Sequence, residues 1–200
     1  MSRWYDAISG NTEKKYRDLG LNLLAAQPGE RILEIGFGTG HALVTLAQAV
    51  GPQGHVTGID LSDGMADITR QRLAQANLSE RVTLLRGDAA THPFEPDTFD
   101  AAFMSFTLEL FDTPEIPHVL GACLRLLRPG GRLGVVTLVK GTPPGWPVRL
   151  YEWFHDRLPT MVDCRPIFGR AALQEAGFKL EKVDTEMMWG LPVEILLGRK

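Results

Sequence analysis

Residues 31–40 have the sequence Arg31-Ile-Leu-Glu-Ile-Gly-Phe-Gly-Thr-Gly40, and this stretch decides the fold. Its first five residues are typical of a buried strand, and an apolar segment of helical period follows from His41 to Val50. Between them lie glycines at alternate positions. Glycine is needed where the backbone takes unusual dihedral angles or where a ligand presses against it, and a helix start offers free N–H groups. The stretch therefore predicts a strand, a glycine turn and a helix that together hold a nucleotide.

Two acidic residues near the turn indicate which kind of nucleotide it holds. Asp60 ends the next expected strand, and it follows Gly40 by about the 20 residues that separate the glycines from a ribose-binding carboxylate in dinucleotide folds. Those folds favour the pattern G-x-G-x-x-G, whereas this turn has G-x-G-x-G and is preceded by Glu34. A carboxylate in that place repels a pyrophosphate and attracts a cationic ligand.

Three further segments follow the glycine turn in a recognisable order: Gly58-Ile-Asp60-Leu-Ser, Gly87-Asp88-Ala89 and Leu127-Arg-Pro-Gly-Gly-Arg-Leu133. In these four motifs, which span about residues 31 to 139, the chain strongly resembles the class I S-adenosylmethionine (SAM)-dependent methyltransferases. Within that family it is most similar to the ubiquinone/menaquinone-biosynthesis methyltransferases with a type 11 domain. SAM has a sulfonium group, an ammonium group and no phosphate, which agrees with the acidic Glu34.

The resemblance implies a set of cofactor contacts. Glu34 would organise the glycine turn and the methionine end of SAM, and Asp60 would accept from both ribose hydroxyls. Asp88 and the backbone of Ala89 would read the edge of the adenine. The expected cofactor-binding residues are Glu34, Gly36, Phe37, Gly38, Gly40, Asp60, Leu61, Met65, Asp88, Ala89, Ser105 and Phe106. Purely structural roles stay open for several of them, as backbone-bonding carboxylates, helix caps or core side chains.

The alternation of strands and helices predicts an α/β fold with a parallel sheet. We expect strands at 31–36, 55–60, 81–87, 99–105 and 131–139, and helices at 11–26, 40–50, 63–76 and 114–127, the last capped by Thr113. A helix at 168–176 and strands at 178–185 and 193–199, joined by a long loop at 186–192, complete the pattern. The resemblance implies a Rossmann-like, seven-stranded, mostly parallel sheet with an antiparallel C-terminal strand and helices on both faces. Residues 1–200 are expected to form one domain, with 1–28 as an N-terminal helical cover and 141–168 as a lid-like insertion containing a short helix at 148–158.

The motifs assign no catalytic residue. Glu109 is the candidate proton acceptor, because it lies near the expected methyl-transfer face, and the alternative that it only belongs to a loop or the next helix stays open. The family's amino-methylating N-P-P-Y signature is replaced by Ser105-Phe-Thr-Leu-Glu-Leu-Phe111, which argues against methylation of a nucleobase or a glutamine amide. Cys123 and Cys164 show no metal-ligand spacing, so we expect reduced thiols and no metal.

Aromatic and methionine side chains gather in three regions that cover the site in the resembled family. They are Trp4, Tyr5 and Tyr16, then Trp146, Tyr151, Trp153, Phe154, Met161 and Phe168, and finally Met187, Met188 and Trp189. Such side chains adapt to irregular apolar ligands, although they would also be present if they only packed on one another. We therefore expect a small apolar or aromatic acceptor, quinone-like, phenolic or lipid, with S-adenosylhomocysteine (SAH) as the product and the methylated atom undetermined.

Composition limits the other partners. A net charge of −3 with scattered basic residues excludes a general attraction to nucleic acid. The N-terminus is not that of a signal peptide, and no apolar run reaches the roughly 18 residues of a membrane span. We expect a cytoplasmic protein with at most transient membrane contact, and oligomerisation stays open. Two alternative functions are an NAD-dependent oxidoreductase and a non-catalytic SAM-binding module, and a nucleic-acid methyltransferase is a weaker third.

Overall fold

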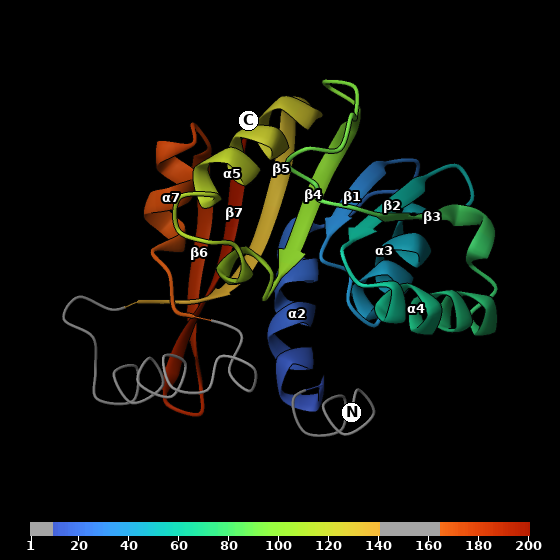
Figure 1. The fold of residues 1–200 in the computed structure, drawn as a ribbon, viewed down its shortest axis with the longest axis horizontal. Coiled ribbons are helices and arrows are strands. Elements are labelled where there is room, and N and C mark those ends of the chain that lie inside the picture. Colours follow the sequence, from blue (N-terminus) through green and yellow to red (C-terminus); the bar gives the residue numbers. More distant parts are fainter. Residues whose placement is uncertain (1–9, 141–164) are drawn as a thin grey trace.

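The computed structural model describes residues 10–140 and 165–200. They form a seven-stranded sheet in the order β3-β2-β1-β4-β5-β7-β6 (Figure 1). The first five strands pair in parallel, and β7 runs antiparallel to both of its neighbours, β5 and β6. This confirms the predicted fold class. The strands are β1 (Arg31–Ile35), β2 (His55–Asp60), β3 (Val82–Arg86), β4 (Phe99–Ser105), β5 (Leu127–Leu138), β6 (Lys179–Met188) and β7 (Leu191–Arg199).

Helices cover both faces of the sheet because the buried strands alternate their side chains between two apolar cores. Ile32, Phe103 and Val136 face one core, whereas their chain neighbours Leu33, Met104 and Val135 face the other. The first core is closed by α2 (Gly10–Leu24), α3 (His41–Val50) and α4 (Asp63–Gln75), and the second by α5 (Ile116–Leu126) and α7 (Gly169–Glu175). Two short 3-10 helices, η1 (Ser79–Arg81) and η2 (Leu108–Leu110), complete the described elements.

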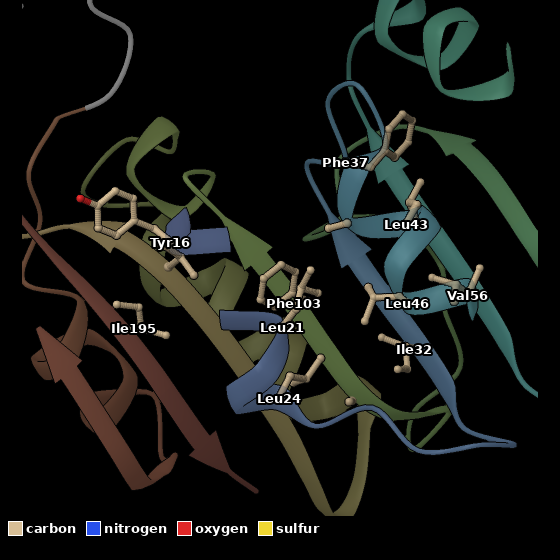
Figure 2. Close-up of a cluster of buried hydrophobic side chains, with 14 of the residues drawn as sticks. Tyr16, Leu21, Leu24, Ile32, Phe37, Leu43, Leu46, Val56, Phe103 and Ile195 are labelled. Carbon is tan, nitrogen blue, oxygen red and sulfur yellow. The ribbon is translucent and has the colours of Figure 1, made fainter. Parts of the chain in front are cut away.

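The N-terminal helix α2 lies across the sheet and contacts β4, β5 and β7. Its Leu21 and Leu24 pack beside Phe103 (Figure 2). The helix approaches closely at Gly20, where a Cβ atom would lie 2.4 Å from Val136 Cγ2. At its C-terminal end, Arg132 Nε of β5 donates to the carbonyl of Leu24 at 3.0 Å. The N-terminal cover that the sequence predicts therefore packs into the first core from residue 16 onward.

The connection between β6 and β7 differs from the prediction. The sequence predicted a long loop at 186–192, but the strands continue to Met188 and from Leu191, and only two residues join them. Trp189 has φ +51° and Gly190 has φ +83°. Two positive φ angles are the requirement of a tight hairpin turn, which usually has Asn-Gly or Asp-Gly. The turn was missed because a tryptophan occupies the position where those polar residues are the usual signal.

The start of β5 and the N-cap of α5 were also predicted wrongly. The strand begins at Leu127 and not at 131: Phe99 pairs with Leu127 but Ala101 pairs with Arg132, so the predicted turn is an irregularity inside the strand. Thr113 does not cap α5. The helix has Glu115 at its N-cap without a side-chain cap bond.

Three other predictions concern membrane-spanning helices, the two cysteines and the expected insertion. In the described ranges, no helix combines the length and apolar character needed to cross a bilayer. Cys123 is a free, buried thiol on α5, and burial raises its pKa to about 12. Cys164 and the expected helix at 148–158 lie outside the described residues.

Because α2 approaches β5 closely, replacing a glycine by alanine should destabilise the protein in α2 but stabilise it in α5. Gly20→Ala should lower the free energy of unfolding by about 1–3 kcal/mol, because the new methyl group overlaps Val136. Gly121→Ala on α5 is the matched control: its Cβ meets nothing within 4 Å, so the gain in helix propensity should stabilise the protein by up to about 1 kcal/mol. Urea denaturation of both variants measures this, and a shared sign would contradict the docking of α2.

Candidate cofactor-binding site

The glycine turn joins β1 to α3 at the carboxyl edge of the parallel strands, where ligands bind in open α/β sheets. Gly36, Gly38 and Gly40 all have positive φ angles, of +70°, +49° and +78°. The Gly36 N–H donates to the carbonyl of Ile59 at 2.8 Å, which ties the turn to the end of β2. The sequence correctly predicted this strand, turn and helix.

Side chains from three other elements hold the turn in place. Asp60, at the end of β2, accepts from the Gly38 N–H at 2.9 Å through Oδ2 and from the Ser62 N–H at 2.9 Å through Oδ1. The hydroxyl of Thr69 on α4 donates to the Gly38 carbonyl at 2.9 Å. Thr107, after β4, lies 3.4 Å from the Gly36 carbonyl. Sequence reasoning found Asp60 but missed both threonines, because neither stands at a spacing that marks it.

The three glycines have different roles. A Cβ atom at Gly36 would lie 2.3 Å from Thr107, and one at Gly40 would lie 2.5 Å from Thr69. These two positions need glycine so that the turn fits against the protein itself. A Cβ atom at Gly38 would meet nothing within 4 Å. The turn therefore leaves open space above Gly38, where a ligand can approach the backbone.

The carboxylate of Glu34 lies at the end of β1 beside this turn. The residue is only 3% exposed, and its Oε2 has no hydrogen-bond partner. Burial raises the pKa of Glu34 well above its ordinary value, the positive charge of Arg17 opposes this, and the negative charge of Asp60 adds to it. A buried carboxylate oxygen without a partner is costly and needs an explanation. A cationic group fits this position, and a phosphate does not, so these residues suit SAM better than a dinucleotide.

The residues expected around the adenine stand at the ends of β2 and β3. Leu61 is 67% exposed, so its side chain is available to a ligand, and Met65 is half-buried in the first turn of α4. Asp88 Oδ1 accepts from the Ala90 N–H at 2.9 Å, which shapes the loop after β3. Ala89 has its methyl group in the second core, so only its backbone is open to a ligand.

The residues expected around the methionine end follow β4. Phe106 has φ +51°, and its N–H donates to the carbonyl of Val136 at 2.8 Å. Its ring meets the ring of Tyr16 edge-on, with 6.5 Å between the centroids. Ser105 is half-buried, and its carbonyl lies 3.1 Å from the Thr107 hydroxyl. Phe37 is different, because its side chain lies in the first core (Figure 2) and only its backbone belongs to the turn.

Glu109, the candidate proton acceptor, lies on η2 and is 1% exposed. Its Oε2 accepts from the Thr137 hydroxyl at 2.9 Å and its Oε1 from the Leu138 N–H at 3.1 Å. Burial raises the pKa of Glu109 to about 7, although these two donors oppose the shift. In this arrangement the carboxyl group ties η2 to the end of β5.

The aromatic and methionine side chains expected to cover the site divide into two groups. Tyr16 and Met188 belong to the first core, and the Tyr16 hydroxyl donates to the Met187 carbonyl at 2.6 Å, so packing explains these two. Phe168, Met187 and Trp189 are 52%, 59% and 67% exposed, as is Leu110 at 53%. Trp4, Tyr5, Trp146, Tyr151, Trp153, Phe154 and Met161 lie outside the described residues.

Comparison with known proteins shows which family this chain belongs to. Residues 32–131, half of the chain, match the family described as "Methyltransferase domain". The chain belongs to this methyltransferase family. It is 31% identical over 157 residues to a demethylmenaquinone methyltransferase of Listeria monocytogenes, an alignment that covers 78% of this chain and 65% of the relative. The predicted family, and SAM as the cofactor of that family, are thereby confirmed.

Solved structures share the fold at lower sequence identity. A SAM-dependent methyltransferase from Aquifex aeolicus matches 92% of this chain and 88% of its own, with a TM-score of 0.67 and 22% identity. The [4+2]-cyclase SpnF matches 93% of this chain and 80% of its own, with a TM-score of 0.72 and 21% identity. Proteins with this fold therefore catalyse more than one kind of reaction, so the fold alone does not identify the reaction.

The buried Glu109 predicts a pH-dependent stability that one substitution removes. The folded state keeps a proton on this group up to about pH 7, whereas the unfolded chain releases it near 4.5. Stability therefore falls as the pH rises from about 4.5 to about 7, by about 3 kcal/mol from this group. Glu109→Gln imitates the protonated group and should become more stable than the unmodified protein by that amount between pH 4.5 and 8.

Urea denaturation across this pH range measures the difference. Glu95→Gln, at an exposed carboxylate, is the control and should leave the difference constant. A constant difference for Glu109→Gln as well would mean that Glu109 is not protonated near neutral pH.

Proposed function

We propose that this protein transfers a methyl group from SAM to a small, apolar acceptor. The single observation that carries the proposal is the buried, unpartnered Glu34 oxygen beside the open space above Gly38. This arrangement suits a cationic nucleotide and disfavours a pyrophosphate. SAM, when bound, supplies an already activated methyl group, so the protein has mainly to align the reactants and exclude water.

The described residues can hold each part of the cofactor. Asp60 uses one acceptor site on each carboxylate oxygen for the backbone, and a carboxylate has about four such sites. It can therefore accept from ribose hydroxyls while it continues to hold the turn. Leu61 and Met65 offer apolar surface to the adenine, and the loop shaped by Asp88 offers its backbone to the adenine edge. Ser105 and Phe106, directly after β4, would lie beside the methionine end.

The acceptor class rests on two kinds of support. Relatives at about 31% identity are named demethylmenaquinone methyltransferases, and this chain spans about two thirds of their length, 65% in the first case. The side chains of Leu110, Met187 and Trp189 are exposed and apolar. Leu110 follows β4, Met187 lies at the end of β6 and Trp189 lies in the β6–β7 turn, all at the same edge as the cofactor residues. A quinone-like, phenolic or lipid acceptor fits this surface, and contact with a membrane would be transient.

Glu109 is assigned a positioning role in this proposal. Its two oxygens accept from Thr137 and Leu138 inside the protein, and the residue is only 1% exposed, so burial keeps the carboxyl group away from the open edge of the sheet. It fixes the segment from Thr107 to Leu110 against β5, and the exposed Leu110 is part of that segment. A direct role as the base stays a prediction.

Two alternatives make different predictions for ligand binding. An NAD-dependent oxidoreductase would bind NADH at this edge, and NADH would compete with SAH. A non-catalytic module would bind SAM without turnover on any quinone, phenol or lipid acceptor. Glu34 argues against the first alternative, and turnover assays with quinone, phenol and lipid acceptors test the second directly.

Calorimetric titration with SAM, SAH and NADH tests the proposal. The protein should bind SAM and SAH with NADH silent, and Gly38→Val should lose both ligands because the side chain fills the open space above the turn. The matched control is Gly130→Val. Gly130 also has a positive φ, of +78°, and an open Cβ position, but it lies near the beginning of β5, at the opposite edge of the sheet.

Both variants should unfold at similarly lowered temperatures, since both place a branched side chain at a positive φ, and only Gly38→Val should lose binding. Normal SAH affinity in Gly38→Val would remove the glycine turn from the cofactor site. Binding of NADH alone would overturn the proposed function.

A further inference from the structure

Two buried polar atoms of opposite charge lack hydrogen-bond partners near the glycine turn. One is Oε2 of Glu34 and the other is Nε of Arg17, on the N-terminal helix α2. A third unpartnered buried atom, Oε2 of Glu194, belongs to a carboxylate whose other oxygen pairs with Arg170 at 2.8 Å. Glu34 has no such ion pair among the described residues, so it and Arg17 need a common explanation.

The guanidinium of Arg17 is largely buried, and no hydrogen bond to its Nε compensates for that burial. Its side chain is 14% exposed, and the nearest carboxylate oxygen, on Asp18, lies 3.9 Å from Nε, beyond hydrogen-bond distance. Asp18 is itself engaged by Lys14 at 2.6 Å. Burying a cation with an open donor is costly, and a ligand that accepts from it would remove that cost.

The packing of α2 places the residue before Arg17 against an expected cofactor residue. The preceding residue, Tyr16, stacks edge-on against Phe106 after β4, and Leu21, one turn later, points into the first core (Figure 2). Arg17 also lines an open cavity of about 630 Å³ between α2, α3 and α4, which none of the expected cofactor residues lines but which is also lined by His41, the residue directly after Gly40. Its positive charge acts on Glu34, although the two side chains form no ion pair with each other.

We propose that Arg17 is a specificity-determining residue of the cofactor site, whose guanidinium binds the carboxylate of the cofactor's amino-acid end while Glu34 takes its ammonium group. This inference rests on the proposed function and assigns a residue outside the glycine-turn motifs to it. An amino-acid end carries both charges on one carbon atom, so one cation and one anion from different elements match it. A guanidinium is suited to the task, because it can donate two parallel hydrogen bonds to a carboxylate.

Together, Arg17 and Glu34 would make the site recognise the amino-acid end of the ligand as well as its nucleoside. A ligand without the carboxylate leaves Arg17 unsatisfied, and a ligand without the whole amino-acid end leaves both side chains unsatisfied. The site should therefore prefer SAH to 5′-methylthioadenosine, and SAM to decarboxylated SAM. Arg17 should be responsible for the second preference.

The test is calorimetric binding of these four nucleotides to the full chain and to three variants. Arg17→Ala should weaken SAM and SAH on the order of tenfold to a hundredfold, the effect expected for charged hydrogen bonds. It should leave 5′-methylthioadenosine and decarboxylated SAM within about twofold, because neither has the carboxylate. Arg17→Lys keeps the charge but loses the planar fork, so its loss for SAM should be smaller. Lys14→Ala, one turn earlier on the same helix and exposed, should change none of the four affinities.

The possible results separate the hypotheses. Equal weakening of all four nucleotides by Arg17→Ala would show that Arg17 only supports the fold around the turn, and unchanged affinity for SAM and SAH would remove it from the site. Either result overturns the inference and leaves the proposed function standing. If the unmodified protein binds neither SAM nor SAH, the proposed function itself falls, and the inference falls with it.

Discussion

The hydrogen bond from the Gly38 N–H to Asp60 is the interaction on which the rest of the site depends. It joins the glycine turn after β1 to the end of β2, so that two neighbouring strands share one binding edge. Thr69 and Thr107 hold the carbonyls of the same turn from α4 and from the segment after β4. The turn has positive φ angles at alternate residues, and hydrogen bonds from the surrounding elements to Gly36 and Gly38 hold it in this conformation.

Glu34 shows how the same edge selects its ligand. Its buried, unpartnered oxygen is unfavourable in the protein alone, and a cation supplies what is missing. Under the proposed function, a bound sulfonium or ammonium group would stabilise the ionised form of this carboxyl group, whereas a phosphate would not. In this proposal, the glycines, which many nucleotide-binding sheets share, say less about the cofactor than the carboxyl group that lies beside them.

The side proposed for the acceptor is built from elements that are distant in the chain. The segment after β4 is tied to β5 by Glu109, α2 brings Tyr16 to Phe106, and the tight β6–β7 turn exposes Met187 and Trp189. None of these elements belongs to the four motifs. Since a cyclase has the same overall fold, the fold alone does not determine the reaction.

The sequence by itself determined the parallel sheet, the glycine turn and the placing of Glu34, Asp60 and Asp88 at strand ends, because apolar period, glycine spacing and acidic residues are local signals. It did not reveal Thr69 or Thr107, because their contacts depend on how α4 and the segment before η2 pack against the turn, nor the unpartnered Arg17, because its burial depends on the packing of α2. It misjudged the Trp189-Gly190 hairpin and the start of β5, where pairing with a neighbouring strand overrode local preference. Only the tertiary structure showed that Gly36 and Gly40 accommodate protein side chains while Gly38 faces open space. Such distinctions depend on distances between residues that are far apart in the chain.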